Sequence, residues 1–414
     1  MRDTKRSRRR FLLDAVRSGG ALAGASCFLQ SPAWLLEALA EEPRGDPLEA
    51  LLATAPRARY WVSSASGDPA ACSKCHDPSL GLDAKPPRHS RTMIRCLLCA
   101  QACTLAEGER GLCRARIHWQ GELRTLVYGR PMTVHVDPVE KKPFYHFLPG
   151  SAAFSLATSG CPLRCKFCQN WEISQARPED YRSEFVPAAD VARAAGRRQA
   201  PIIAFTYNEP TVFTEYLTDI ARAGRTLGLR SVLVSCGFMT EAPLAEMCEV
   251  LDGIKIDLKG FSPEFYRTVS SAELAPVLRS IRQVHRSGVH LEIVNLVVPT
   301  LNDSEAMLRE LVAWIAAEIG PDVPVHFTRF HPDYQLRNLP PTPLVTLERA
   351  RELAMDRGLH YVYVGNVPDH PGNHTYCPKC GRIVVRREGF FVGEQHVRGG
   401  ACEFCGTQIA GVWT

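Results

Sequence analysis

Three cysteines in the middle of the chain have a spacing that is typical of an iron–sulfur site. Three residues separate Cys161 from Cys165, and two separate Cys165 from Cys168. A short loop can therefore bring three thiolates to three corners of a [4Fe-4S] cluster, leaving one iron atom without a protein ligand. An open iron can chelate the amino and carboxylate groups of S-adenosylmethionine, which then supplies radical chemistry. The alternatives for this motif are a zinc knuckle or three buried thiols.

Two pairs of cysteines near the C-terminus predict a site in which all four metal ligands are thiolates. Each pair has the pattern Cys-x2-Cys-Gly, and twenty-one residues separate the pairs. We expect a tetrahedral zinc site of structural role, because no coordination position stays open; rubredoxin-like iron is the alternative. Two disulfides are a weaker alternative. The four residues are Cys377, Cys380, Cys402 and Cys405.

A third group of cysteines precedes the central motif in a basic, glycine-containing stretch. Its pattern, Cys-x2-Cys-x3-Cys-x9-Cys, again supplies four thiolates and therefore indicates a metal. The spacing leaves two alternatives open, structural zinc and an auxiliary iron–sulfur cluster. The four residues are Cys96, Cys99, Cys103 and Cys113.

The remaining cysteines carry weaker signals. Cys72, Cys75 and His76 match the Cys-x-x-Cys-His pattern of c-type haem attachment, although half a zinc site gives the same pattern. No compelling axial ligand stands nearby, so haem is the less favoured alternative. Cys236 and Cys248 have the surroundings of ordinary buried thiols.

Short apolar segments alternate with helical ones between residues 150 and 366, and they must position the central cysteines. The expected strands are 152–158, 201–207, 231–235, 253–258, 291–298 and 325–330, with 361–364 as a further candidate. The expected helices are 188–198, 211–227, 242–251, 275–287, 304–319 and 344–357. This order predicts an α/β fold, a parallel right-handed (β/α)6 barrel or partial barrel. Its chemistry is expected in loops after the strands.

The domain organisation follows from these motifs and from the composition between them. A linker with the Cys-x-x-Cys-His knuckle is expected at 41–90, because the stretch is rich in Pro, Ala, Ser and Gly. A four-cysteine module at 91–135 precedes the core at 136–371. A zinc-ribbon-like module at 372–414 completes the chain.

Together these motifs resemble the radical SAM superfamily, in its branch that is similar to pyruvate formate-lyase activating enzyme. Closer still, they are similar to the radical SAM member of the AmmeMemoRadiSam system. The resemblance depends on the cysteine patterns, on the stretch 137–147, which reads DPVEKKPFYHF, and on 207–210, which reads YNEP. It implies a [4Fe-4S] cluster, S-adenosylmethionine and an electron donor. It also implies Memo-like and AMMECR-like proteins as partners.

The resemblance implies further residues that contact the cofactor, each at or beyond a strand end. Glu209 is expected near the S-adenosylmethionine ammonium and Lys259 near its carboxylate, with Asp257 facing the substrate. Asn295 stands where some relatives have an arginine, and His331 matches a histidine close to the cofactor. Ser235 ends the third strand, within possible reach of the ribose. The alternatives are a helix start at Glu209, a surface ion pair at 257–259 and a loop histidine that caps backbone groups.

Three functions are compatible with this sequence. The first is an oxidoreductase or transferase that abstracts hydrogen from a small molecule by a 5′-deoxyadenosyl radical. The second is an activase that generates a glycyl radical on a partner protein. The third is an exported electron carrier that does not cleave S-adenosylmethionine. The substrate itself stays unknown at this stage.

The N-terminus has the features of a twin-arginine export leader over residues 1–40. Residues 7–12 read SRRRFL, and the Ala-x-Ala sequence at 38–40 offers a cleavage site. We therefore expect an exported, extracytoplasmic protein; the alternative is a cytoplasmic protein with a basic tail. The apolar stretch is shorter than the roughly 20 residues that a stable membrane span needs. Residues 1–10 account for the whole net charge of +5, so bulk charge gives no basis for nucleic-acid binding.

Overall fold

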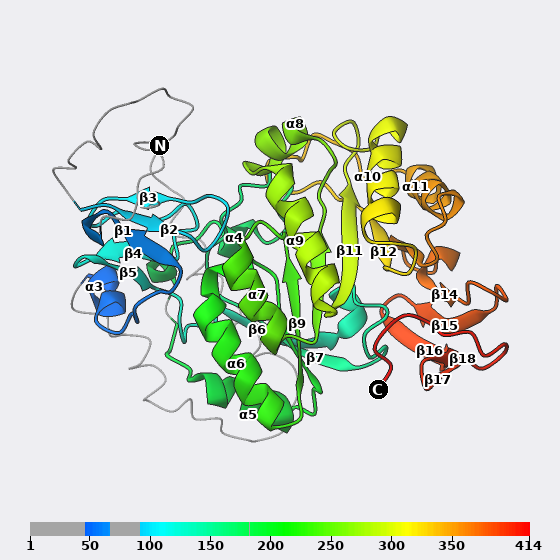
Figure 1. The fold of residues 1–414 in the computed structure, drawn as a ribbon, viewed down its shortest axis with the longest axis horizontal. Helices are drawn as coiled ribbons and strands as arrows, with labels where there is room; N and C mark the ends of the chain where they lie inside the picture. Colours follow the sequence, from blue (N-terminus) through cyan, green and yellow to red (C-terminus); the bar gives the residue numbers. More distant parts are fainter. Residues whose placement is uncertain (1–45, 67–91, 182) are drawn as a thin grey trace, which may run out of the picture. The chain divides into compact units, whose positions relative to one another are not determined.

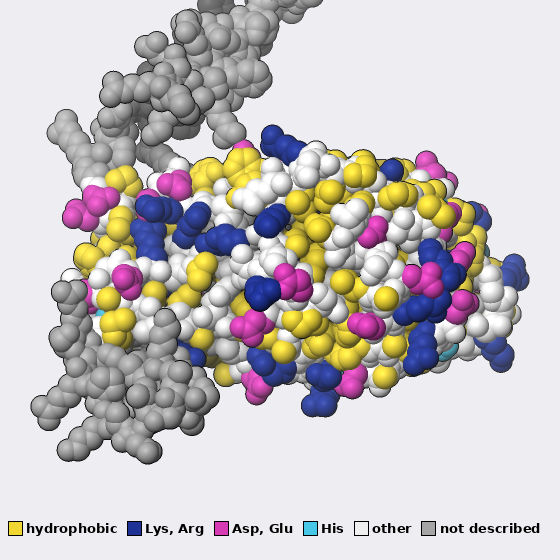
Figure 2. Space-filling view, turned by 90° about the horizontal axis from the view of Figure 1, so that it is seen from above, with side chains coloured by type: hydrophobic (Ala, Val, Ile, Leu, Met, Phe, Trp, Pro, Cys, Tyr) yellow, Lys and Arg dark blue, Asp and Glu magenta, His cyan; other side chains and the backbone are white. Residues whose placement is uncertain are grey.

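The computed structural model describes residues 46–66, 92–181 and 183–414. The expected leader at 1–40 and the motif Cys72, Cys75 and His76 lie outside these residues. Among the described helices, none combines the length and the apolar character that crossing a membrane requires. Charged side chains of both signs are interspersed with apolar ones on the face shown in Figure 2.

An eight-stranded sheet forms the core, in the order β13-β12-β11-β10-β9-β8-β7-β6. Strands β7 to β13 run parallel, whereas β6 (Thr133–Pro138) pairs antiparallel with β7. The sheet is therefore mixed, and the expected all-parallel order is wrong at its β6 edge. The parallel strands are β7 (Ala152–Ala157), β8 (Ile202–Phe205), β9 (Arg230–Ser235), β10 (Gly253–Asp257), β11 (His290–Val297), β12 (Val325–Arg329) and β13 (Val362–Gly365).

Helices follow the parallel strands along the chain and pack beside one another on the sheet (Figure 1). They are α5 (Ala188–Arg197), α6 (Thr214–Thr226), α7 (Glu241–Val250), α9 (Leu274–Ser287), α10 (Glu305–Glu318) and α11 (Leu344–Asp356). The apolar side chains of α5 and α9 recur at helical spacing, so one face of each is buried. Shorter helical turns, α4 (Trp171–Ser174) and α8 (Pro263–Phe265), are additions to the predicted pattern.

The N-terminal cysteine module is built from short strands and begins earlier than the sequence predicted. Strand β1 (Trp61–Ser63) pairs with β2 (Ile94–Cys96), and β2 pairs with β3 (Thr104–Leu105). Strands β4 (Arg116–Trp119) and β5 (Glu122–Thr125) form a hairpin. The interpretation of 41–90 as a linker is thus wrong for its described part, which contains β1 and the helix α3 (Pro47–Leu52). Elements this short show no readable periodicity.

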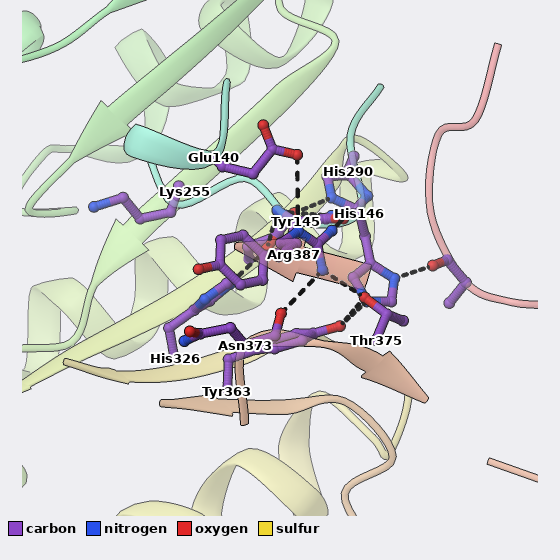
Figure 3. A network of polar contacts seen from close by, with 12 residues as sticks. Glu140, Tyr145, His146, Lys255, His290, His326, Tyr363, Asn373, Thr375 and Arg387 are labelled. Carbon is purple, nitrogen blue, oxygen red and sulfur yellow. Dashed lines mark hydrogen bonds and ion pairs between the residues drawn. The ribbon is translucent and has the colours of Figure 1, made fainter. Parts of the chain in front are cut away.

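The C-terminal module packs on the core through a buried polar network (Figure 3). Its strands are β14 (Thr375–Tyr376), β15 (Ile383–Glu388), β16 (Phe391–Gln395), β17 (Val397–Arg398) and β18 (Ala401–Cys402). Arg387 on β15 is fully buried and donates to the Tyr145 carbonyl at 2.7 Å and to the Thr375 hydroxyl at 2.8 Å. Its guanidinium lies over the Tyr145 ring at 4.1 Å, which binds the module to the chain before β7.

A buried carboxylate, Glu292 on β11, is the acceptor at the centre of the same network. It accepts from the Tyr145 and His146 amides at 2.8–3.0 Å, from His326 at 2.6 Å and from His290 at 3.0 Å. Burial alone would raise the pKa of Glu292, but the two histidine donors hold it well below its ordinary value. The charge is thus compensated by hydrogen bonds, as a buried carboxylate requires.

Because His146 is buried in its neutral form, we expect stability to fall as the pH drops below about 6.5. Burial lowers the pKa of His146 to about 3, and burial also lowers the pKa of His326. Between about pH 6.5 and the pKa of His146 the unfolded chain binds a proton that the folded chain excludes, so His146 lowers the free energy of unfolding by up to about 1.4 kcal/mol for each pH unit. His326 changes the slope in the same direction. The free energy of unfolding in urea at pH 7.5, 6.5 and 5.5 measures this slope.

The variant His146→Gln is expected to be less stable at pH 7.5 but to depend less steeply on pH below 6.5. His360 is exposed beside Asp322, so His360→Gln is the matched control and should keep the slope of the unsubstituted protein. Equal slopes for all three proteins would contradict the assignment of the pH dependence to His146.

Candidate active site

The loop after β7 carries the three central cysteines into a cavity of about 500 Å³. Cys161, Cys165 and Cys168 all line this cavity, and Cys165 is buried. On the strands, the lining side chains alternate along the sequence, for example Val294 and Leu296 on β11, because alternate residues of a strand share one face. The cysteines thus share one cavity with one face of the sheet.

Hydrogen bonds from neighbouring segments fix the cysteine loop. The Asn208 side chain, after β8, donates to the Gly160 carbonyl at 2.8 Å, and the Asn170 side chain donates to the Tyr207 carbonyl at 2.8 Å. Tyr207 has a φ of 70°, in the left-handed region that glycine favours. The Tyr207 hydroxyl donates to Asp137 at 2.5 Å. The YNEP segment therefore supports the cysteine loop through its backbone and its amide.

The three thiols fit a cluster better than a single metal ion. Burial raises the pKa of all three, and Lys259 opposes this rise at Cys165, so bound iron would have to displace their protons. Among described residues, three or more ligand atoms lie within 4.8 Å of one another only in the C-terminal cysteine set. The three sulfur atoms thus lack the compact arrangement of the ligands of one ion, and a cube, in which each thiolate binds its own iron, does not need it.

Glu209 and Ser235 both line the cavity, yet their polar atoms are used to connect two strand ends. The Glu209 carboxylate accepts from the Thr211 hydroxyl at 2.6 Å, the Ser235 hydroxyl at 2.8 Å and the Cys236 amide at 2.7 Å. Glu209 is 2% exposed. In the described structure Glu209 thus positions the loops after β8 and β9. Cys236, which was predicted to be an ordinary buried thiol, also lines the cavity.

Three charged side chains project from one face of β10 and its end. Asp257 accepts from Lys259 at 3.1 Å and from Lys255, and all three residues line the cavity. Burial would raise the pKa of Asp257, but the two ammonium groups lower it to about 2. Burial would lower the pKa of Lys259, but Asp257 and the Cys165 and Cys236 thiols raise it well above its ordinary value. Lys255 was not predicted as a site residue. Its two-residue spacing from Asp257 on a strand indicates that both side chains point to the same face.

Two predicted cofactor contacts lie away from this cavity. Asn295 is on the opposite face of β11 from Val294 and Leu296, and its amide donates to the Leu258 carbonyl at 2.7 Å. His331 is exposed in the loop after β12 and is not among the lining residues. The strand pleat and the loop path thus keep both side chains out of the cavity, and their contacts with the cofactor stay predictions. His326, inside β12, lines the cavity instead, and its Nδ1 has no hydrogen-bond partner among the described residues.

The four C-terminal cysteines form a compact group outside this cavity. Their sulfur atoms all lie within 4.8 Å of one another, with 3.5 Å between Cys377 and Cys405 and 3.9 Å between Cys380 and Cys402. All four are free thiols, so the alternative of two disulfides is not what the described structure contains. The spacing is compatible with one tetrahedral metal ion.

Comparisons with known proteins give the family of the chain. The sequence model of the radical SAM superfamily matches residues 155–312. The chain is 40% identical over 318 residues to an uncharacterized protein of Methanocaldococcus jannaschii, covering 76% of this chain and 95% of that protein. It is 24% identical over 174 residues to pyruvate formate-lyase-activating enzyme of Listeria monocytogenes, covering 39% and 68%.

Two solved structures are also similar to parts of this chain. A domain of pyruvate-formate lyase-activating enzyme from Bacteroides vulgatus is 16% identical, with a TM-score of 0.36, over 39% of this chain and 98% of that one. A radical SAM methyltransferase from Sphaerobacter thermophilus is 14% identical, with a TM-score of 0.41, over 53% and 67%. With the match at 155–312 and the relative that is 40% identical, the chain belongs to the radical SAM superfamily and is an enzyme.

Proposed function

We propose that this enzyme binds a [4Fe-4S] cluster through Cys161, Cys165 and Cys168 and cleaves S-adenosylmethionine reductively, to abstract hydrogen from a substrate. The observation that carries the proposal is the placement of three thiols on the wall of one cavity that also contains buried charged groups. A zinc knuckle or three inert thiols would not explain why the charged side chains of Lys259 and Asp257 lie in the same cavity. The third alternative, an electron carrier, would leave this cavity without a use.

The protein contributes binding and orientation to this reaction. The bound cluster and cofactor supply one-electron cleavage of the sulfonium C–S bond, which gives methionine and a 5′-deoxyadenosyl radical. Lys259, whose pKa is well above its ordinary value, keeps its charge and can pair with the cofactor carboxylate. His326 offers Nδ1 as an acceptor within the same cavity. Glu209 positions the loops on which the cofactor would lie.

Anaerobic reconstitution tests this proposal directly. The protein is loaded with iron and sulfide, mixed with S-adenosylmethionine and dithionite, and 5′-deoxyadenosine is measured by chromatography. We expect product only when the loaded cluster, S-adenosylmethionine and dithionite are all present. A chain with a complete cluster that made no 5′-deoxyadenosine would exclude the proposed reaction.

Replacing Lys259 should weaken the binding of S-adenosylmethionine rather than the cluster. In Lys259→Met we expect the KM for S-adenosylmethionine to rise about 10- to 100-fold, because a charged partner of the carboxylate is lost. Asp257 keeps Lys255 as its partner in this variant, so the fold should tolerate the change. Lys166→Met is the matched control, since Lys166 is exposed on the cysteine loop. An unchanged KM at equal iron content would refute the assigned role.

The finer assignment that we propose is to the AmmeMemoRadiSam system, with Memo-like and AMMECR-like proteins as partners. A second candidate function, activase of a partner protein, is supported by the relatives named pyruvate formate-lyase-activating enzyme. The two functions give different products from a partner protein incubated with the reduced enzyme. A glycyl-radical doublet in its EPR spectrum indicates an activase, and an unchanged partner with a modified small molecule indicates the first function.

We also propose that the C-terminal cysteines hold one structural zinc ion. The compact sulfur geometry of Cys377, Cys380, Cys402 and Cys405 supports this assignment. Elemental analysis of protein purified without added metal should give about one zinc per chain. Loss of that zinc in Cys380→Ser, with the activity of the reconstituted enzyme retained, would support a structural role.

Export is the last part of the proposal. The arginines at 8–10 and the Ala-x-Ala sequence support a twin-arginine leader that carries the protein already folded around its cofactors. Replacing Arg8 and Arg9 by Lys should retain the protein in the cytoplasm of its native host, as measured by cell fractionation. Equal distribution of both forms would favour the cytoplasmic alternative.

A further inference from the structure

The N-terminal cysteine module brings four thiols together around a buried arginine. Cys96, Cys99 and Cys113 are buried, and Cys103 is half-buried. Four thiols gathered in one module supply the number of ligands that a tetrahedral metal ion or a four-iron cluster needs, whereas packing alone does not need such a group.

The backbone around these thiols leaves room for sulfur. A Cβ at Gly111 would lie 3.6 Å from the Cys113 sulfur and 3.7 Å from the Cys103 sulfur, so both sulfur atoms flank this glycine. The Leu112 amide donates to the Cys103 sulfur at 3.4 Å. N–H groups directed at sulfur are typical of iron–sulfur sites, where they tune the reduction potential.

The spread of the sulfur atoms separates the three cysteine sets of this chain. Of the residues that the structure describes, only the C-terminal four have their sulfur atoms within 4.8 Å of one another, as one tetrahedral ion requires. Neither the N-terminal four nor the set Cys161, Cys165 and Cys168 has this compact arrangement. The N-terminal set therefore differs from the single-ion site in the same respect as the set on the loop after β7.

The N-terminal module also contacts the loop of the first cluster directly. A Cβ at Gly160 would lie 2.3 Å from the Cys113 carbonyl oxygen, so only glycine, here with a φ of +95°, allows this approach. Gln101 donates to the Pro162 carbonyl at 3.0 Å, and Arg164 donates to the Leu112 carbonyl. Cys113 and Cys161 thus belong to two segments in van der Waals contact.

A buried cation lies beside the N-terminal set and is already paired with one carboxylate, Glu215. Arg116 is fully buried, and it interacts electrostatically with Cys96 and Cys113 as well as with Glu215, to which it donates at 2.7 Å. A cluster with four thiolate ligands carries net negative charge, which a neighbouring guanidinium stabilises. Arg116 Nε has no hydrogen-bond partner among the described residues, so the guanidinium keeps a donor available.

We propose that Cys96, Cys99, Cys103 and Cys113 bind a second [4Fe-4S] cluster, which delivers electrons to the cluster at Cys161, Cys165 and Cys168. The site itself is independent of the proposed function, whereas the delivery of electrons rests on it. A low-potential one-electron donor reduces the second cluster from the 2+ to the 1+ state. The same electron then passes to the first cluster, which returns the second to 2+.

Metal and sulfide analysis of matched variants tests the site. The variant Cys161→Ala/Cys165→Ala/Cys168→Ala should retain about four iron and four sulfide ions per chain after reconstitution. The variant in which all four N-terminal cysteines are replaced should also retain about four of each. A variant in which all seven cysteines are replaced should hold no sulfide. The C-terminal site does not interfere, because a single ion binds no inorganic sulfide. Zinc without sulfide in the first variant would overturn the proposal.

The delivery of electrons is tested by counting them. Both clusters are reduced, excess reductant is removed by gel filtration, and S-adenosylmethionine is added. We expect about two 5′-deoxyadenosine molecules per chain, and the EPR signal of the second cluster, identified in the variant without Cys161, Cys165 and Cys168, should disappear. About one molecule per chain with that signal retained would overturn the delivery of electrons. No product at all would instead refute the proposed function, while iron and sulfide analysis would still decide the site.

Discussion

Cys165→Ala is expected to lower the rate of 5′-deoxyadenosine formation at least about a hundredfold. Loss of outer-shell partners alone costs metal sites about 10- to 100-fold, and Cys165 would be a direct iron ligand. Cys165 lines the cavity, and an alanine side chain in its place has no atom that can bind iron. The measurement is product formation per chain after reconstitution, together with bound iron and sulfide.

Cys248→Ala is the matched control for this prediction. Cys248 is half-buried on α7, and it is not among the residues that line the cavity. The control should keep the iron content and the rate of the unsubstituted protein. If Cys165→Ala kept more than a tenth of the rate, the cluster that cleaves S-adenosylmethionine would have to bind elsewhere.

The parallel part of the sheet was predictable because buried strands and their helices carry strong local patterns. The segment expected at 253–258 is β10 (Gly253–Asp257), and the helix expected at 304–319 is α10 (Glu305–Glu318). Strand β6 was not predicted, because Val134 and Val136 are exposed and its sequence therefore lacks a buried apolar face. An antiparallel edge strand forms because it pairs with its neighbour, and the local sequence pattern does not reveal this pairing.

The site was predictable where its geometry is local. Cys161, Cys165 and Cys168 lie on one loop, so their spacing alone indicated a common ligand. The predictions for Asn295 and His331 required knowing which face of β11 lines the cavity and where the loop after β12 runs. A single sequence determines neither. Lys255 and His326 were missed because charged and aromatic polar residues inside buried strands violate the general pattern. Such violations are common at functional sites.

Arg387→Met is expected to lower the free energy of unfolding by about 3–5 kcal/mol, the largest stability effect that we predict. Its guanidinium is fully buried and donates to the Tyr145 carbonyl, the Asn373 carbonyl and the Thr375 hydroxyl. Removing it leaves the buried Glu140 carboxylate, 3.8 Å away, without its cation, and breaking a buried pair costs about this much. Urea unfolding followed by circular dichroism measures the change.

Arg386→Met is the matched control, because Arg386 precedes Arg387 on β15 but is exposed, and it forms an ion pair with the exposed Glu394. Its free energy of unfolding should change by less than about 0.5 kcal/mol. An equal loss in both variants would refute the role of the buried network.

A double variant separates the two causes of the loss at Arg387. Burial already raises the pKa of Glu140, and Arg387 opposes that rise, so Arg387→Met leaves a carboxyl group that must take up a proton to stay buried. In Glu140→Gln/Arg387→Met no unpaired charge remains, and only the hydrogen bonds of Arg387 are lost. The double variant should therefore lose less stability than the sum of the two single variants, by more than about 1 kcal/mol. Strict additivity would mean that the hydrogen bonds and the Tyr145 ring contact alone hold the C-terminal module on the core. Because Glu140 and Tyr145 also line the cavity, the charge pair would then have to be explained by the active site and not by the fold.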